Sequence, residues 1–288
     1  MFDGIEKFEN ENLAKHTTLH INSIAGWFLL PKNQEELEQV FYEASLCGVE
    51  VFVLGGGSNI LASDSGFSGA VISMRKFDEI IILGENKLQV GAGVNLFALN
   101  HFCQQRGFYG LEWSYGIPGS VGGAVKMNAG AYGGEFCPLV KEITIFDGRK
   151  IKKRRRLAFS YRKGCLKKGE ILLSAIIQLE SGEKEMILEK MLQNLNKRKA
   201  SQPYGEFSLG SVFKRGKDFV PAKIIEEMGL KGKERGGMQV SVKHSGFIVN
   251  NGEGSADEFL SLVCEIEAEA KKKGFVFERE FVSLGFDE

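Results

Sequence analysis

The sequence has little that would support a disulfide framework or a metal centre. Its five cysteines, among 288 residues, are odd in number, widely spaced and never paired as C-x-x-C, and its four histidines include no pair in a metal-site context. We therefore expect neither disulfides nor zinc, and a reducing compartment, the cytoplasm. Net charge is absent too, because 37 basic residues balance 37 acidic ones. The chain has no overall field that would attract nucleic acid or an anionic membrane.

Long apolar runs are also missing. No run approaches the roughly 20 residues with which a helix crosses a bilayer, and the first residues, MFDGIE, lack the basic and then apolar order of a secretion signal. We therefore expect no membrane attachment. The chain is 43% hydrophobic over its 288 residues, enough to bury sizeable cores, and two or three compact units are expected.

Glycine, in contrast, is abundant at 36 residues, and it gathers in two places. The first is Leu54–Asn59, in which three consecutive glycines follow the strand-like run Val51–Val53. Amide groups in such a turn are not screened by Cβ atoms and can converge on an anionic oxygen such as a diphosphate. The Rossmann fingerprint G-x-G-x-x-G is absent, and another loop follows instead of a helix. For this segment alone, a tight turn without a ligand remains the alternative.

The second glycine-rich segment is Tyr115–Ala124, continued by Asn128–Gly134. Its glycines have no side chains to contribute to a core, so we expect a loop whose surface is shaped around a ligand. Two such segments indicate one large, flat, anionic ligand. A dinucleotide cofactor fits, with one segment on its diphosphate and the other against its ring system.

The hydrophobic periodicity predicts an α+β protein. Helical spacing occurs at Gln34–Cys47, Leu96–Arg106, Glu183–Lys199, Ala222–Met228 and Ala256–Lys273. Strand-like runs occur at 49–54, 71–74, 80–83, 87–90, 142–146, 171–173, 240–242, 247–249 and 275–284. The breaker cluster Ser201–Gly205 indicates a domain boundary. We expect an α/β lobe at residues 1–68, a β-rich lobe at 69–200 and a compact α+β domain at 201–288.

The run Lys152–Arg156 is the one local concentration of basic residues. It follows a hairpin signal, Asp147-Gly148. We interpret the run as a solvated strand face and not as a phosphate or nucleic-acid site.

Several motifs follow one another in a characteristic order. They are Leu54–Leu61 (LGGGSNIL), Gly116–Ala124 (GIPGSVGGA), Asn128–Gly133 (NAGAYG), Ser160–Arg162 (SYR), Gly210–Lys214 (GSVFK), Lys243-His244, Phe247–Asn250 (FIVN) and Glu280. In this order they resemble the UDP-N-acetylenolpyruvoylglucosamine reductase family, and the resemblance runs from about Asn12 to Gly285. It implies an FAD-binding region of the vanillyl-alcohol oxidase type in two lobes and a C-terminal substrate domain, in the compact subtype without a tyrosine-bearing flap.

The resemblance also implies an activity and a cofactor. These are noncovalently bound FAD, with NADPH as co-substrate, and reduction of UDP-N-acetylglucosamine enolpyruvate to UDP-N-acetylmuramate in peptidoglycan precursor synthesis. The partner is then a UDP-sugar, with no nucleic acid, membrane or obligatory protein partner. The implied cofactor-binding residues are Leu54, Gly55, Gly56, Gly57, Ser58, Asn59, Ile60, Tyr115, Gly116, Ile117, Pro118, Gly119, Ser120, Gly122, Gly123, Ala124, Asn128 and Gly130.

Three catalytic residues are implied. Ser211, in isolation an ordinary turn serine, would give a proton to the carbon left basic by hydride addition, for which a weak acid suffices. Arg162 would hold the substrate carboxylate with a planar, permanently charged group. Glu280 would hydrogen-bond the developing enol, either as a protonated acid or through a bridging water. The implied substrate-binding residues are Tyr161, Lys214, His244 and Asn250.

Three segments depart from the family pattern. Asn22–Ala25 stands where relatives carry Gly-Gly-Pro-Ala, Lys163-Gly164 replaces Asp-Ser, and Arg215-Gly216 replaces Asn-Pro. Two other functions therefore stay open: a flavin oxidase or dehydrogenase acting on a small alcohol or sugar, and a nucleotide-binding or scaffold protein without turnover. Bleaching of the flavin by NADPH, followed by reoxidation with the enolpyruvyl substrate, distinguishes the three.

Overall fold

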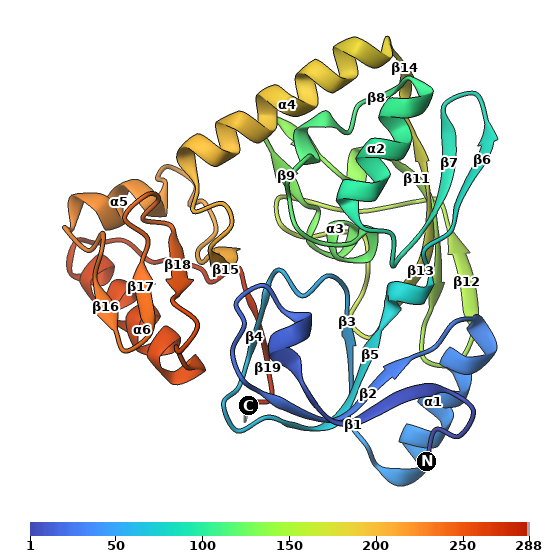
Figure 1. Cartoon of the computed structure of the whole chain (residues 1–288), viewed down its shortest axis with the longest axis horizontal. Helices are drawn as coiled ribbons and strands as arrows, with labels where there is room; N and C mark the ends of the chain where they lie inside the picture. The colour runs from blue at the N-terminus through green and yellow to red at the C-terminus, as the bar shows by residue number, and fades with distance from the viewer. Residues whose placement is uncertain (287–288) are drawn as a thin grey trace. The chain divides into compact units, whose positions relative to one another are not determined.

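The helices and strands follow one another in a mixed order along the chain (Figure 1). The structure is a computed structural model and describes residues 1–286. The helices are α1 (Gln34–Cys47), α2 (Leu96–Arg106), α3 (Val121–Met127), α4 (Lys184–Ser201), α5 (Pro221–Glu227) and α6 (Ala256–Lys272). The strands are β1 (Glu6–Asn12), β2 (Ile24–Leu30), β3 (Val51–Leu54), β4 (Ile60–Ala62), β5 (Phe67–Ser73), β6 (Ile80–Gly84), β7 (Lys87–Gly91), β8 (Phe108–Tyr109), β9 (Gly130–Ala131), β10 (Gly134–Glu135), β11 (Val140–Phe146), β12 (Ile151–Arg154), β13 (Ile171–Gln178), β14 (Glu180–Ser181), β15 (Phe207–Ser211), β16 (Glu234–Arg235), β17 (Met238–Val240), β18 (Phe247–Asn250) and β19 (Val282–Leu284).

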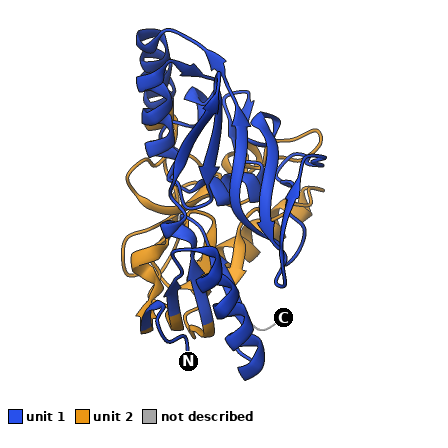
Figure 2. Cartoon of the chain, turned by 90° about the vertical axis from the view of Figure 1, so that its right-hand side faces the viewer, with its two compact units in different colours: residues 1–8, 28–56, 70–197 blue, residues 9–27, 57–69, 198–288 orange. Residues whose placement is uncertain are grey.

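The chain forms two compact units, each assembled from three segments (Figure 2). Unit 1 comprises residues 1–8, 28–56 and 70–197, and unit 2 comprises 9–27, 57–69 and 198–288. The structure thus divides the expected N-terminal lobe, 1–68, between the units. One reason is that β4 pairs in parallel with β19, so that residues near position 60 join the C-terminal segment. The expected boundary after residue 200 lies near the division after Lys197, inside α4.

Unit 1 is built on an antiparallel sheet with the strand order β12-β11-β13-β7-β6. The turn between β11 and β12 is the hairpin that the sequence predicts, and the carboxylate of Asp147 accepts hydrogen bonds from the amides of Arg149 and Lys150. In the basic run, Arg154 pairs with Glu170 and Arg155 with Glu142. Both arginines therefore form ion pairs with carboxylates on neighbouring segments of the sheet region.

The core of unit 1 lies between this sheet and the helices α2 and α3. Leu99 of α2 and Val125 of α3 are buried with Ile143 and Ala175 of the sheet in one apolar cluster. Helix α2 has the bounds that the hydrophobic spacing predicts. It begins after Asn95, whose side chain accepts a hydrogen bond from Phe97 N, and it ends at Gly107, at φ +71°.

A second sheet has the order β1-β2-β5-β3, in which β3 and β5 run parallel. Helix α1 precedes β3. Asn33 caps the start of α1 by accepting a hydrogen bond from Glu36 N at 2.9 Å, and Gly48 ends it at φ +65°. The predicted helix and the strand that follows it are both confirmed.

Unit 2 has its own sheet, with the order β15-β18-β17-β16, and helix α6 packs against it. Phe259, Val263 and Ile266 of α6 are buried in an apolar cluster with residues of the sheet. A capping box of Ser255 and Glu258 begins the helix. The carboxylate of Asp64 accepts two further hydrogen bonds, from the amides of residues 256 and 257 at 2.8 and 2.9 Å.

Two sequence-based expectations differ from the structure. Residues 121–124, expected as part of a loop, begin helix α3, because the side chain of Ser120 caps its first turn and Val121 and Val125 reach the core. The expected final strand 275–284 is a strand only at Val282–Leu284, since the phenylalanines before it pack into the core of unit 2. No helix within residues 1–286 is both long and apolar enough to cross a membrane.

Candidate functional site

The first glycine-rich segment forms a tight turn between β3 and β4. A Cβ atom added at Gly56 would lie 2.6 Å from Gly119 Cα, and one added at Gly55 would lie 2.7 Å from the hydroxyl of Ser120. The two glycine-rich segments therefore approach each other closely at these positions. Close approach of two backbones is a structural reason for the glycines, in addition to any ligand.

The amides of this turn are available to a ligand. Among the described residues, the backbone N–H groups of Gly56, Gly57 and Ser58 donate to no protein acceptor. Consecutive amides of this kind form an anion-binding turn. The turn can hold the diphosphate of a dinucleotide such as FAD.

The second glycine-rich segment combines a turn with a short helix. Gly119 has φ +139°, and the Ser120 hydroxyl accepts a hydrogen bond from Gly123 N at 3.4 Å. A Cβ atom added at Gly123 would meet nothing nearer than the Ser120 hydroxyl at 3.8 Å. Protein packing therefore does not require glycine at position 123, and an open surface remains there for a ligand.

Tyr115, at the start of this segment, is buried in an aromatic group. Its hydroxyl lies 3.2 Å from His101 Nε2, and its ring stacks on Phe97 with the centroids 5.2 Å apart. Tyr115 also packs against Ile187 and Met191 of α4. Met186 of the same helix is 65% exposed.

Asn128 ties the end of helix α3 to three neighbours. Its side-chain amide donates to Glu135 Oε2 at 3.0 Å and to the carbonyl of Ser160 at 3.1 Å, and its oxygen accepts from Cys137 N at 3.0 Å. Its backbone has φ +44°, a conformation that asparagine tolerates better than most residues. These contacts give Asn128, an implied cofactor residue, a structural role in shaping the Gly130 hairpin.

Arg162 lies at the tip of a tight turn beside this hairpin. The turn is closed by two backbone hydrogen bonds between Ser160 and Lys163, at 2.8 and 3.0 Å, and Arg162 itself has φ +53°. Its guanidinium group donates to the carbonyl of Gly130 at 3.3 Å and lies over the Tyr161 ring, 4.9 Å from the centroid. Such a backbone conformation is costly for arginine and is typical of functional turns.

In unit 2 the structure brings the Ser211 and Glu280 segments together. The amide of Glu280 donates to the carbonyl of Val212, the residue after Ser211, at 2.8 Å. Ser211 ends β15 after Gly210, which has φ +89°, and the register of β15 against β18 shifts just before it. Two residues far apart in sequence are thus held on adjacent segments.

Asn59, implied as a cofactor residue, also belongs to this arrangement. Its side-chain amide donates to the carbonyl of Glu280 at 3.0 Å, across 221 residues of sequence. This contact is not evident from the amino-acid sequence. No local signal could have revealed it, because the partner is brought near only by the pairing of β4 with β19.

The implied substrate residues of unit 2 have different surroundings. Lys214 forms an ion pair with Glu278 at 2.5 Å. Burial lowers the pKa of His244, and its Nδ1 accepts a hydrogen bond from Gly246 N at 3.1 Å, which assigns the ring proton of the neutral form to Nε2. Asn250 is 4% exposed, and its side chain bonds Leu19 O, Gly252 N and Gly254 N. Asn250 therefore acts within the fold.

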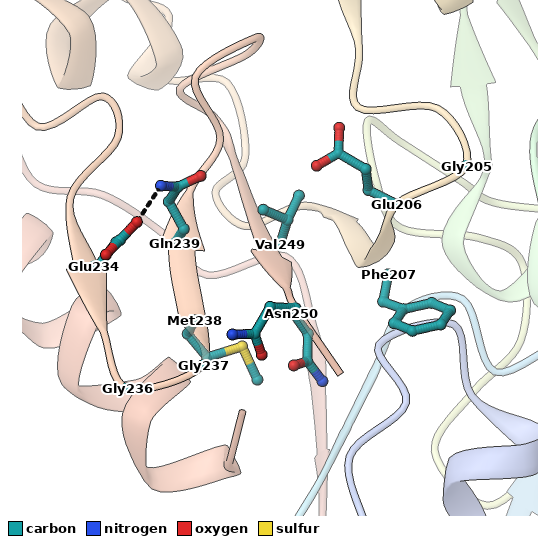
Figure 3. Close-up of a pocket in the computed structure, with 11 residues that line it drawn as sticks. Gly205, Glu206, Phe207, Glu234, Gly236, Gly237, Met238, Gln239, Val249 and Asn250 are labelled. Carbon is teal, nitrogen blue, oxygen red and sulfur yellow. Dashed lines mark hydrogen bonds between the residues drawn. The ribbon is translucent and has the colours of Figure 1, made fainter. Parts of the chain in front are cut away.

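A separate hollow of about 390 Å³ lies in unit 2 (Figure 3). Its lining includes Phe207, Met238, Val249 and Asn250, and Gln239 donates to Glu234 at 2.6 Å across its edge. Of the predicted site residues only Asn250 lines it. The hollow is therefore distinct from the Ser211 and Glu280 segments.

The first departure from the family pattern, Asn22–Ala25, alternates between exposed and buried residues in unit 2. Ser23 is 1% exposed, and its hydroxyl has no hydrogen-bond partner among the described residues. Its carbonyl accepts the amide of Leu13 at 2.8 Å, and Asn22 accepts a hydrogen bond from the side chain of Asn12 at 2.9 Å. The substituted segment is thus well anchored through Asn22 and the backbone. Arg215, the third departure, is exposed.

The fold and these glycine turns define a flavin-binding protein with a separate C-terminal domain. A family model described as an FAD binding domain matches residues 26–149, and one described as the C-terminal domain of UDP-N-acetylenolpyruvoylglucosamine reductase matches residues 202–283. The chain belongs to the UDP-N-acetylenolpyruvoylglucosamine reductase family. The predicted α+β class with an FAD-binding region is thereby confirmed.

Individual relatives match over nearly the whole chain. UDP-N-acetylenolpyruvoylglucosamine reductase of Clostridium novyi is 37% identical, with 93% of this chain and 89% of that protein covered. The enzyme of the same name from Geobacter metallireducens is 36% identical, with 97% and 94% covered. The crystal structure of UDP-N-acetylenolpyruvylglucosamine reductase (MurB) from Thermus caldophilus has a TM-score of 0.84 at 33% identity and covers 97% of this chain and 98% of that one.

Proposed function

We propose that this protein reduces UDP-N-acetylglucosamine enolpyruvate to UDP-N-acetylmuramate, with NADPH as reductant, in peptidoglycan precursor synthesis. The relatives over nearly its full length bear the name of this reductase. The structural observation that supports it most is the hydrogen bond from Glu280 N to Val212 O, 2.8 Å, because it joins the backbone of the proposed acid to the residue that follows the proposed proton donor, Ser211.

FAD is proposed to bind at the turn of Gly56, Gly57 and Ser58, whose backbone amides can donate hydrogen bonds to its diphosphate. When bound, FAD supplies hydride transfer, which no side chain performs. The glycine-rich segments contain neither histidine nor cysteine for a covalent flavin bond. The purified protein is therefore expected to be yellow and to release its flavin on acid precipitation.

Ser211 is the proposed proton donor. Hydride addition to the vinyl group leaves negative charge on the carbon beside the substrate carboxylate, and this carbon is basic enough to accept a proton from a hydroxyl. Glu280 is proposed to hydrogen-bond the enol oxygen as charge develops. It does so either in its protonated form or through a water.

Arg162 is proposed to bind the substrate carboxylate, where charge grows as the reaction proceeds. Its turn conformation and its bond to the Gly130 carbonyl limit how the guanidinium group can move. A fixed, permanently charged group stabilises developing charge without having to reorganise.

The proposed substrate-binding residues include Tyr161, Lys214 and His244. Lys214 carries a positive charge that its partner Glu278, 74% exposed, offsets only partly in solvent. His244 would offer an Nε2 donor without charge, because burial lowers its pKa. Asn250 would act indirectly, by holding the backbone of β18 in place.

The cytoplasm is the proposed location. The free thiols of Cys47, Cys103, Cys137, Cys165 and Cys264 suit a reducing compartment. A UDP-sugar is the proposed partner, without nucleic acid, membrane or an obligatory protein partner.

Anaerobic flavin spectroscopy tests the activity. NADPH should bleach the bound flavin, and the enolpyruvyl substrate should restore its absorbance with formation of UDP-N-acetylmuramate. A flavin that is bleached by a small alcohol or sugar and is not reoxidised by the enolpyruvyl substrate would point to a flavin oxidase or dehydrogenase. A flavin that never turns over would point to a nucleotide-binding or scaffold protein.

A further inference from the structure

The position of Glu280 is set through its backbone from both sides. Its N–H donates to Val212 O at 2.8 Å, and its C=O accepts from Asn59 Nδ2 at 3.0 Å. The backbone at Cα sets the direction of the Cα–Cβ bond, from which the side-chain torsions place the carboxyl group. Two bonds that hold the peptide groups before and after Cα therefore restrict where the Glu280 carboxyl group can point.

The bond from Glu280 N to Val212 O needs no particular side chain, whereas the bond from Asn59 Nδ2 to Glu280 O does. Any residue at 212 supplies a carbonyl, and any residue at 59 supplies the carbonyl that accepts Val282 N at 2.9 Å. The bond to Glu280 O instead needs a side-chain donor of the length of asparagine. Pairing of β4 with β19 begins only at Ile60 and Val282, so it does not itself hold the peptide after Glu280.

The neighbours of Glu280 are anchored by their own side chains. Arg279 forms two bonds of 2.7 Å with Glu267 of α6, and the Phe281 ring meets the Phe259 ring edge-on at 5.4 Å. Glu280 is the residue of this segment whose backbone is held by a side chain from the glycine-rich turn. Asn59 directly follows Ser58, whose amide has no acceptor among the described residues.

We propose that Asn59 is a positioning residue for Glu280 and that its side chain is not a ligand of the flavin. It aligns the carboxyl group with Ser211 for the proton-transfer half of the reaction. The proposal rests on the proposed function, because that function gives Glu280 its role.

Asn59→Asp is the informative variant, since it keeps the shape of the side chain but places an acceptor against the Glu280 carbonyl. A misplacement of about 1 Å can cost about 100-fold in rate, so reoxidation of the reduced flavin by the enolpyruvyl substrate should slow by about 10- to 100-fold. Flavin affinity and the NADPH half-reaction should stay within about threefold of wild type. Asn251→Asp is the matched control, because only the oxygen of Asn251 is used, accepting Glu253 N at 2.9 Å.

Two further measurements separate positioning from a general loss of structure. In combination with Glu280→Gln, Asn59→Asp should add little to the loss, because the group that it positions is already altered. Relative to wild type at the same pH, Asn59→Asp should recover at low pH, where a protonated aspartic acid can donate to the carbonyl. Losses that add fully in the double variant, or weaker flavin binding with an intact second half-reaction, would overturn the proposal.

Failure of the proposed function gives a different result. If wild-type enzyme is not reoxidised by the enolpyruvyl substrate, the function is wrong whatever Asn59 does. Amide hydrogen exchange of residues 278–284 then tests the attachment. Faster exchange in Asn59→Asp than in wild type and Asn251→Asp supports it, and equal exchange overturns it.

Discussion

The two units hold their candidate functional residues in opposite ways. In unit 1 the candidate functional positions are glycines, and a Cβ atom at Gly56 would lie 2.6 Å from the backbone of Gly119. In the C-terminal unit the key positions are side chains and peptide groups that are held by hydrogen bonds, such as those on Glu280. Unit 1 should therefore be sensitive to added side-chain atoms, and unit 2 to the loss of a hydrogen-bond donor or acceptor.

The largest effect is expected for Ser211→Ala. Reoxidation of reduced enzyme by the enolpyruvyl substrate should fall by about 10² to 10⁴, the range for a positioned proton transfer. Reduction of the flavin by NADPH should be nearly unchanged, since no proton is delivered to substrate carbon in that half. Ser211→Cys should recover part of the loss. Stopped-flow absorbance measures both halves, and reoxidation of Ser211→Ala at wild-type speed would exclude the serine from the mechanism.

The next largest effect is expected for Gly56 of unit 1, and it should differ from the effect at Gly123 of the same unit. Gly56→Val should lower the free energy of unfolding by about 1–3 kcal/mol, because the branched side chain forces the two turns apart. It should also weaken flavin binding. Gly123→Ala should keep or raise the apoprotein melting temperature, because the added methyl group meets nothing closer than 3.8 Å and alanine favours a helix more than glycine does. It should nevertheless weaken FAD binding. Calorimetry of apoprotein and flavin titration check the pair, and full FAD affinity in Gly123→Ala would place the ligand away from α3.

A smaller effect is expected for His244 in the C-terminal unit. Burial lowers its pKa from 6.5, so the unfolded chain takes up a proton before the folded one does. Stability should therefore fall as the pH drops below 6.5, and His244→Asn, which keeps an acceptor for Gly246 N, should lose less. The KM for the UDP-sugar should rise a few-fold in this variant and change little between pH 7 and 8. Chemical denaturation at several pH values measures the first effect.

The smallest effect compares thiol reactivity in the two units. Cys103, Cys137 and Cys165 are buried in unit 1, and burial raises the pKa of Cys103 to about 12, whereas Cys47 in unit 1 and Cys264 in unit 2 are exposed. A thiol reagent should modify Cys47 and Cys264 quickly and the three buried thiols only as unit 1 opens. Added FAD should slow only the latter. Equal slowing of Cys264 would show that flavin binding stabilises both units.

Local sequence signals predict the ordinary elements well and the glycine-rich ones poorly. Helix α2 has the predicted bounds, because its apolar spacing, its Asn95 cap and its Gly107 end all agree. Helix α3 was missed because Gly122 and Gly123 disfavour a helix on propensity. The Ser120 cap and the burial of Val121 and Val125 outweigh that cost.

The sequence by itself determined the family, the flavin and the identity of the proposed catalytic residues, because these depend on motifs whose order along the chain is visible without any structure. It also determined the local helices and hairpins, which arise from interactions a few residues apart. Only the tertiary structure decided that residues 57–69 join the C-terminal unit and that Asn59 holds Glu280. The physical reason is that strand pairing and side-chain hydrogen bonds between distant residues depend on how the whole chain packs. The hydrophobic periodicity of a segment does not show which distant segment it will contact.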